Sequence, residues 1–281
     1  MNKDVYVIRP GKDNTYGLGA LIIEVLKYTQ YAERKGFIPY VDWSGTTTQY
    51  SDNSIENVWN YYFSQPIKQL DYTDSMLEFH YSEERDLLTI EDDVRIKKEF
   101  KPSIKLSTRE LFDKYYSFSK EINTQCEQEM IPCKGLIGIL LRGTDYSKLK
   151  PEGHAIQPNI EDAFKVIDRV IRKTGLNDLF LVTEDYTIMD LVYKKYGENL
   201  VRLKSDYQIK NYNGRVKLSL DNDSLEQLGR SPKERGAQYL KKLILLSKCD
   251  YLIAGNTCGS WFSYIISDTY RDVCVFDLGK Y

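Results

Sequence analysis

At 281 residues, of which 42% are hydrophobic and 28% charged, the chain has the length and composition of an ordinary soluble globular protein of one or two domains. Its 39 Lys and Arg residues are balanced by 41 Asp and Glu residues, and the formal charge of −2 argues against a nucleic-acid-binding protein. Five widely spaced cysteines without a CxxC pair argue against both a disulfide framework and a metal cluster, so we expect a reducing cytoplasm.

The first residues carry no targeting pattern. "MNKDVYVIRPG" has charges within four residues of Met1 and a short apolar run, too short for a signal peptide or a membrane span. We therefore expect a cytoplasmic protein. The basic cluster "RIKKEFKPSIK" (95–105) is either a solvated surface or a contact with a charged polysaccharide or with anionic lipid on the inner face of the membrane.

The chain begins with a strand, a helix and a strand. Apolar residues predict strands at 4–10 and 37–43, and 18–36 has helical apolar spacing with Gly36 as its stop. This order is a βαβ unit, so the chain starts as an α/β protein.

Residues 44–106 have weak periodicity and are rich in Tyr, Asn, Ser and Asp. The aromatic stretch 56–67 is expected to form a short helix packed on the first domain, or alternatively part of an acceptor-binding wall. A Ser-x-x-Glu capping box then predicts one long helix over 107–130.

From residue 134 onward, strands and helices alternate regularly. The predicted strands are 135–141, 178–185, 199–203, 251–255 and 273–279, and the predicted helices are 159–175, 186–197, 231–250 and 257–268. The polar stretch 204–231 is expected to be a loop. Short links between alternating elements predict a parallel sheet covered by helices on both faces. We therefore expect two Rossmann-like α/β domains, 1–133 on the acceptor side and 134–281 on the nucleotide-sugar side.

Small and polar residues follow the predicted strands, at the edge where open parallel sheets bind ligands. They are Arg142 to Asp145, Thr183 to Asp185, "NTCGS" (256–260) and, in the first domain, "YGLG" (16–19). The last two begin helices, whose N-termini favour phosphate. Arg142 could hold a diphosphate through bidentate hydrogen bonds, or could form a strand-end salt bridge to Asp145.

Neither glycine-containing stretch is a Walker A loop or a G-x-G-x-x-G fingerprint, so NAD and ATP are poorly supported. Two α/β domains facing across a cleft, with diphosphate contacts and no obvious metal ligands, describe a GT-B glycosyltransferase. There a cation and helix N-termini can stabilise the departing nucleoside diphosphate without a metal, while a carboxylate or histidine takes the proton of the acceptor hydroxyl.

Four stretches resemble the fucosyltransferase superfamily, which includes the alpha-1,2, alpha-1,6 and protein O-fucosyltransferases and the rhizobial nodulation fucosyltransferase. Three of them are similar to its C-terminal motifs, and the fourth is similar to its glycine-rich loop and first helix. They are "LLRGTDY" (140–146), "LFLVTED" (179–185), "LKKLILLSKCDYLIAGNTCGSWFSYIIS" (240–267) and "NTYGLGALIIEVLKYTQYAERKGFIPYVDW" (14–43).

The resemblance implies a GT-B fold and a metal-independent, inverting transfer from GDP-fucose to a glycan or lipid-linked glycan acceptor, with no cofactor beyond the donor. It places Arg142 on the donor diphosphate and Asp145 in the arginine motif. The remaining donor-binding residues that we expect, partly from the resemblance and partly from the strand ends, are Tyr16, Gly17, Gly19, Thr183, Glu184, Asp185, Asn256, Thr257, Cys258 and Ser260.

The proton acceptor is open between three residues. If Arg142 holds Asp145, that carboxylate is better suited to orienting the arginine, and Glu152 and His154 in the loop "KPEGHAIQP" become the better candidates. Two other functions remain open: a metal-dependent GT-A transferase that uses "DND" (221–223), and a non-catalytic sugar- or nucleotide-binding protein on a degenerate transferase scaffold.

Overall fold

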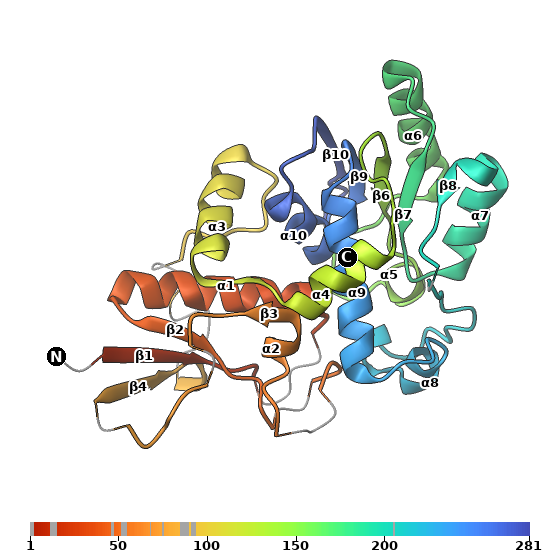
Figure 1. Ribbon diagram of the computed structural model, residues 1–281. Helices are drawn as coiled ribbons and strands as arrows, with labels where there is room; N and C mark the ends of the chain where they lie inside the picture. The colour runs from red at the N-terminus through yellow and green to blue at the C-terminus, as the bar shows by residue number, and fades with distance from the viewer. Residues whose placement is uncertain are drawn as a thin grey trace. The chain divides into compact units, whose positions relative to one another are not determined.

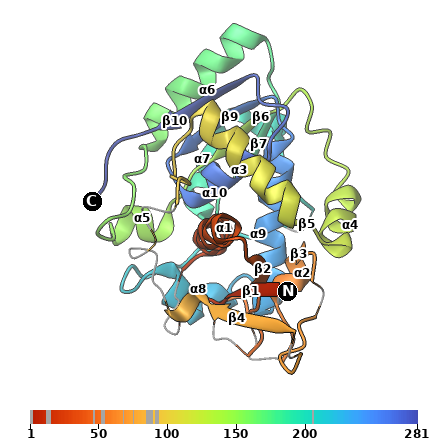
Figure 2. The ribbon, with the colours of Figure 1, turned by 90° about the vertical axis from the view of Figure 1, so that its left-hand side faces the viewer.

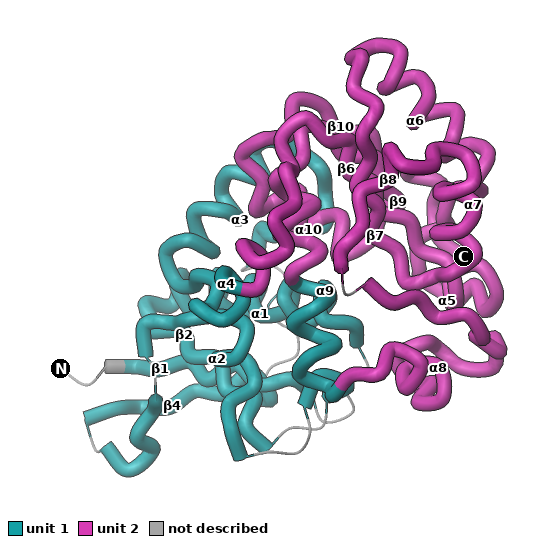
Figure 3. Tube along the Cα trace, turned by 45° about the vertical axis from the view of Figure 1, so that its right-hand side comes forward, with its two compact units in different colours: residues 1–124, 231–240 teal, residues 125–230, 241–281 magenta. Residues whose placement is uncertain are grey.

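The computed structural model divides the chain into two compact α/β units (Figures 1 and 3). It describes residues 3–11, 16–45, 48–51, 55–67, 69–74, 76–84, 90, 94–204 and 206–281. Unit 1 consists of residues 1–124 and 231–240, and unit 2 of residues 125–230 and 241–281. The division falls near the expected boundary of 133, but the excursion of 231–240 into unit 1 was not expected.

Unit 1 is built on a three-stranded parallel sheet of order β2-β1-β4. Its strands are β1 (Lys3–Ile8), β2 (Ile38–Val41) and β4 (Leu77–Tyr81). Helix α1 (Leu18–Lys35) packs on this sheet, and Figure 2 looks along the helix. Gly36 ends α1 in the left-handed conformation at φ 79°, as the sequence predicted. β4 lies within the stretch whose periodicity was too weak to predict a strand.

An aromatic cluster completes unit 1. The short helix expected within 56–67 is α2 (Trp59–Tyr62), followed by β3 (Phe63–Ser64), which pairs antiparallel with β5 (Ser117–Phe118). The predicted single helix over 107–130 is wrong, because β5 separates α3 (Pro102–Tyr115) from α4 (Lys120–Gln128). The stacked rings of Trp59 and Phe63, with Phe118 beside them, explain why the chain breaks its helix to pair with β3.

Unit 2 contains a five-stranded parallel sheet of order β10-β9-β6-β7-β8. Its strands are β6 (Ile137–Leu140), β7 (Leu179–Val182), β8 (Leu200–Val201), β9 (Tyr251–Gly255) and β10 (Asp272–Phe276). Its helices are α5 (Thr144–Lys148), α6 (Ile160–Thr174), α7 (Tyr186–Tyr196), α8 (Asn222–Glu226), the second half of α9 (Pro232–Ser247) and α10 (Cys258–Ile266). Apart from α5 and α8, the sequence predicted each of these elements.

Alternating side chains bury both faces of this sheet. Ile139 and Leu181 pack with Phe164 of α6 and Met189 of α7 on one face. On the other face, Gly138 lies against Leu246 of α9 so closely that a Cβ atom would clash. The sheet is therefore a rigid platform whose strand ends share one edge.

The stretch 204–231 is only partly the predicted loop. Over its described residues it contains a 3₁₀ turn (Leu218–Leu220) and α8, and it buries a small apolar cluster of Ile209, Tyr212, Leu218 and Leu225. Among the residues that the structure describes, no helix has both the length and the apolar character needed to cross a bilayer.

Candidate functional site

Arg142 lies just beyond the carboxyl end of β6 and forms ion pairs with two carboxylates. Its Nη2 lies 3.2 Å from Asp145 Oδ1, and its Nε lies 3.1 Å from Glu184 Oε1. The guanidinium carbon lies 4.9 Å from the centre of the Tyr146 ring. The side chain keeps 24% of its surface exposed, so a permanent cation is fixed in position and still reachable from solvent.

Glu184, which follows β7, organises the turn that carries Arg142. Its Oε1 accepts hydrogen bonds from the backbone N–H of Gly143 at 3.1 Å and from the hydroxyl of Thr144 at 2.8 Å. Thr144 has a φ of 37°, in the left-handed region that a β-branched residue seldom adopts. Backbone strain of this kind persists only where surrounding contacts hold it, and it is concentrated at functional sites.

Asp185 links two structural elements through its side chain. Its Oδ1 caps α7 by accepting from Thr187 N at 2.7 Å and Ile188 N at 3.2 Å, while its Oδ2 accepts from Thr144 N at 2.8 Å. A Cβ atom on Gly143 would clash with this carboxylate, so Gly143 is needed for the close approach. The carboxylate thus ties the end of β6 to the start of α7. Its assignment to donor binding remains a prediction.

The third strand end, after β9, is built around the start of α10. Thr257 and Ser260 form a reciprocal cap: Thr257 Oγ1 accepts from Ser260 N at 3.1 Å, and Ser260 Oγ accepts from Thr257 N at 2.9 Å. Both side chains are buried, and Cys258 is half-buried. Asn256 donates to Asp277 at 3.4 Å. The cap fixes a helix N-terminus, with its partial positive charge, at the same edge of the sheet as Arg142.

The loop with Glu152 and His154 runs beside this edge, held by the C-terminal residues. Its backbone pairs with Gly279 and Tyr281. The His154 ring meets the Tyr146 ring edge-on, at 5.4 Å between centroids, so a single tyrosine separates His154 from Arg142. Glu152 is exposed.

Two residues that we had not singled out also belong here. Burial raises the pKa of Tyr146 to about 12, so the phenol stays neutral under the guanidinium. Gln157, from the same loop as His154, lies so close to Gly255 that a Cβ there would clash. Its Oε1 is buried without a hydrogen-bond partner among the described residues. Tyr146 follows the arginine motif directly, which was a usable signal, whereas nothing local marked Gln157.

The structure brings most of the predicted site residues together in unit 2. Tyr16, Gly17 and Gly19 instead belong to unit 1, where Gly17 precedes the first residue of α1 and Tyr16 is 57% exposed. The preceding Asn14 and Thr15 of the glycine-containing stretch lie outside the described residues.

Two acidic groups among the described residues could suggest a metal site. Asp221 of "DND" is buried and caps α8, accepting from Ser224 N at 3.2 Å and Ser224 Oγ at 2.7 Å. Among the described residues, the ligand atoms of Asp4, Glu78 and His80 lie within 4.8 Å of one another. These three residues lie on the paired strands β1 and β4 of unit 1, where Asp4 is directly opposite Glu78.

No protein-family model and no curated protein matches the chain. Several solved structures match the chain. NodZ alpha-1,6-fucosyltransferase soaked with GDP-fucose is 15% identical, with a TM-score of 0.55 over 98% of this chain and 96% of that chain. Fucosyltransferase NodZ from Bradyrhizobium gives a TM-score of 0.56 at the same identity and coverage. POFUT1 in complex with GDP-fucose is 9% identical, with a TM-score of 0.52 over 99% of both chains. These likenesses confirm the fold that the motifs predicted: the chain has the fold of the GT-B fucosyltransferases.

Proposed function

We propose that this protein is a metal-independent, inverting glycosyltransferase that moves fucose from GDP-fucose to a glycan acceptor. The observation that carries the proposal is Arg142, a fixed and accessible cation at the strand edge where this fold class binds its ligands. Neighbours of the same fold were crystallised with GDP-fucose and GDP, which supports that donor.

Arg142 has the chemistry that the departing group requires. As the bond between the sugar and the diphosphate breaks, negative charge develops on the phosphate oxygens, and an arginine already in place stabilises it without reorganisation. Asp145 and Glu184 hold the guanidinium plane. We expect an incoming diphosphate to take over part of the hydrogen-bonding capacity that they share. The N-terminus of α10 would supply further partial positive charge.

The proton acceptor is proposed to come from the loop with Glu152 and His154. Asp145 suits this role less well, because Arg142 occupies its Oδ1 and Leu218 N donates to its Oδ2 at 3.3 Å. His154 is separated from Arg142 only by Tyr146, whereas Glu152 is exposed at the surface. Substituting Glu152 by Gln should therefore slow transfer less than substituting His154 by Asn.

The biological setting that we propose is bacterial surface-polysaccharide synthesis, with a lipid-linked acceptor reached by peripheral contact with the inner membrane. The basic cluster 95–105 motivates this. Flotation with anionic liposomes at low salt should recover the protein, and failure to float would contradict the membrane contact.

The experiment that tests the function is a thermal-shift comparison of GDP, UDP, CDP and ADP, followed by a transfer assay with EDTA. A nucleotide at about 100 times its Kd should add about 2.7 kcal/mol to the stability of the folded state. We expect GDP to give the largest shift, and transfer to survive EDTA. Stabilisation by GDP without any transfer would favour the non-catalytic binding protein, and loss of transfer in EDTA would favour a metal-dependent enzyme.

A further inference from the structure

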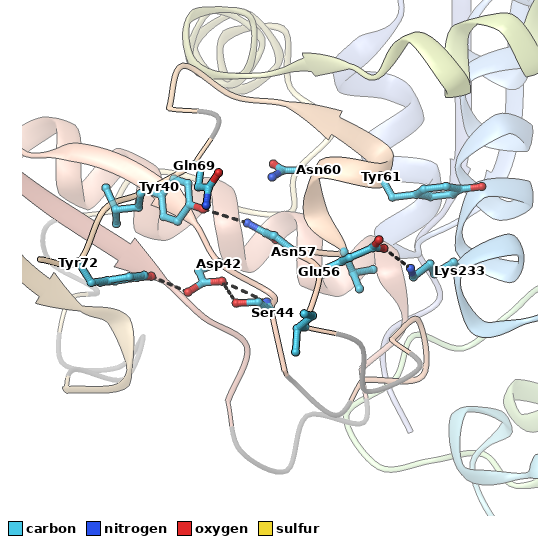
Figure 4. Close-up of a pocket in the computed structure, with 13 residues that line it drawn as sticks. Tyr40, Asp42, Ser44, Glu56, Asn57, Asn60, Tyr61, Gln69, Tyr72 and Lys233 are labelled. Carbon is cyan, nitrogen blue, oxygen red and sulfur yellow. Dashed lines mark hydrogen bonds and ion pairs between the residues drawn. The ribbon is translucent and has the colours of Figure 1, made fainter.

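A cavity of about 550 Å³ opens in unit 1, and the aromatic stretch 56–67 contributes part of its lining (Figure 4). Its lining combines the rings of Tyr40, Tyr61 and Tyr72 with the polar side chains of Asp42 and Ser44. The volume lies within the range of small-molecule sites, and the mixture of rings and polar groups is typical of a site that orients its ligand.

Asp42 orients the side chains that line this cavity, but it has no hydrogen-bond acceptor position left for a ligand. Its Oδ1 accepts from the backbone N of Ser44 at 3.1 Å and from the hydroxyl of Ser44. Its Oδ2 accepts from the hydroxyl of Tyr72 at 2.5 Å and from Arg9 Nη2 at 3.2 Å. A carboxylate offers about four lone-pair positions, so these four donors saturate it. Its role is to fix its neighbours.

The fixed neighbours decide which groups the cavity can bind. A hydroxyl has one hydrogen, and Ser44 and Tyr72 both give theirs to Asp42. Their oxygens can therefore offer only lone pairs to a ligand, and the Tyr72 oxygen already accepts one long hydrogen bond, from Arg9 Nη2 at 3.4 Å. A matching ligand must bring hydrogen-bond donors to this wall.

The charges around the cavity are already balanced. Arg9 is paired with Asp42, and on the opposite wall Lys233 lies 2.6 Å from Glu56 Oε2. Lys233 stands in the first turn of α9, the part of that helix that belongs to unit 1. A phosphate or carboxylate ligand would have to compete with these pairs, so the cavity favours an uncharged molecule.

A rigid frame keeps this arrangement in place. Asn57 accepts from Trp43 N at 2.9 Å and Trp59 N at 3.2 Å, and it donates to Val41 O at 2.6 Å and to the Tyr40 hydroxyl at 3.5 Å. All of its hydrogen-bonding capacity is used within the protein, so the cavity is formed before a ligand arrives.

From these observations we infer that the unit 1 cavity binds one ring of a neutral sugar, with its hydroxyl groups donating to Ser44 and Tyr72. A sugar ring combines several hydroxyl donors with an apolar face that can lie on a tyrosine ring, and it carries no charge. That this ring belongs to the glycan acceptor rests on the proposed function; the binding itself does not.

The test is saturation-transfer NMR on the full chain, with methyl β-glucoside, methyl β-galactoside, methyl N-acetyl-β-glucosaminide and glucose 6-phosphate as probes. At least one neutral glycoside should receive saturation and bind more tightly than the phosphorylated sugar. Tyr72→Phe and Ser44→Ala should each raise its Kd by about three- to tenfold, since each removes one hydrogen bond between the protein and the sugar. Each variant removes a single oxygen atom from a different element of the lining, so Ser44→Ala serves if Tyr72→Phe disturbs the fold. Tyr193→Phe, at an exposed tyrosine of α7, is the matched control and should bind like the parent.

Each contrary outcome identifies what has failed. If no neutral glycoside binds to a protein that GDP stabilises, the sugar site is wrong and the donor proposal stands. If a glycoside binds but GDP does not stabilise the protein, the proposed function is wrong and the sugar site stands. Tighter binding of glucose 6-phosphate, or a Kd unchanged in both Tyr72→Phe and Ser44→Ala, would overturn the inference.

Discussion

Replacing Arg142 by Ala is the most direct test of the catalytic proposal. Loss of one fixed donor to the charge that develops in a transition state costs about 2.7–4 kcal/mol, which corresponds to a decrease of about 10² to 10³ in turnover. The Lys variant keeps the charge but loses the fork of donors that reaches Asp145 and Glu184 together, so it should recover only part of the activity.

The same change also affects stability. Asp145 and Glu184 keep only 8% and 17% of their side-chain surface exposed, and without the arginine they lose their cation. A cost of roughly 1–3 kcal/mol is expected, and the melting temperature should fall by roughly 2–4 °C for each kcal/mol. Activity must therefore be measured well below the melting temperature of the variant, on protein whose circular dichroism matches the parent.

A matched control is Arg202, whose guanidinium lies 4.1 Å from the centre of the Tyr193 ring on the surface of unit 2. Arg202→Ala removes an arginine stacked on a tyrosine, as Arg142→Ala does, and should leave kcat/KM unchanged. If folded Arg142→Ala protein retained kcat/KM for donor and acceptor within about threefold of the parent, the reasoning about the leaving group would be refuted.

Three further outcomes follow from the geometry. Gly143→Ala forces a Cβ atom onto Asp185 and should lower stability by about 1–3 kcal/mol in thermal melts, while Gly11→Ala, in open space, should not; equal melts would contradict the close packing. His154→Asn should lower the transfer rate while GDP still raises the melting temperature, and a weakened response to GDP would instead make it a donor-binding residue. Burial raises the pKa of Asp42, but hydrogen bonds from Ser44 and Tyr72 and the charge of Arg9 outweigh it, so the pKa is lowered. The stabilisation that ionised Asp42 gives to the folded state is therefore complete above the ordinary pKa of an aspartate, near 4, and is lost as the pH falls through the lowered pKa. In urea titrations, the stability difference between the parent and Asp42→Asn should shrink below about pH 4; a constant difference would argue against the lowered pKa.

The sequence predicted those elements whose signals are local. Gly36 and Gly175 each mark the left-handed end of a helix, and both α1 and α6 end there. The strand ends with Arg142 and Glu184 could likewise be found, because apolar runs stop abruptly at charged residues in a regular alternation.

Elements that depend on distant partners could not be predicted. The helix expected over 107–130 is interrupted where Ser117 and Phe118 pair with β3, more than fifty positions earlier in the chain. The cavity of unit 1 likewise joins Asp42 to Lys233, and no local pattern relates those two residues. The hydrogen bonds that link Glu184 to Gly143 and Thr144 are also long-range, so the candidate site was predicted by its strand ends but not by its internal contacts.

The saturation of Asp42 separates the binding of a sugar from the transfer of its proton. A carboxylate whose four lone-pair positions are already filled by protein donors, and whose pKa is lowered, is a poor proton acceptor at neutral pH. If a sugar hydroxyl lies in that cavity, Asp42 cannot also activate it. Changes to Ser44 and Tyr72 should therefore alter which sugar is accepted without altering the proton-transfer step, so the two properties could change independently.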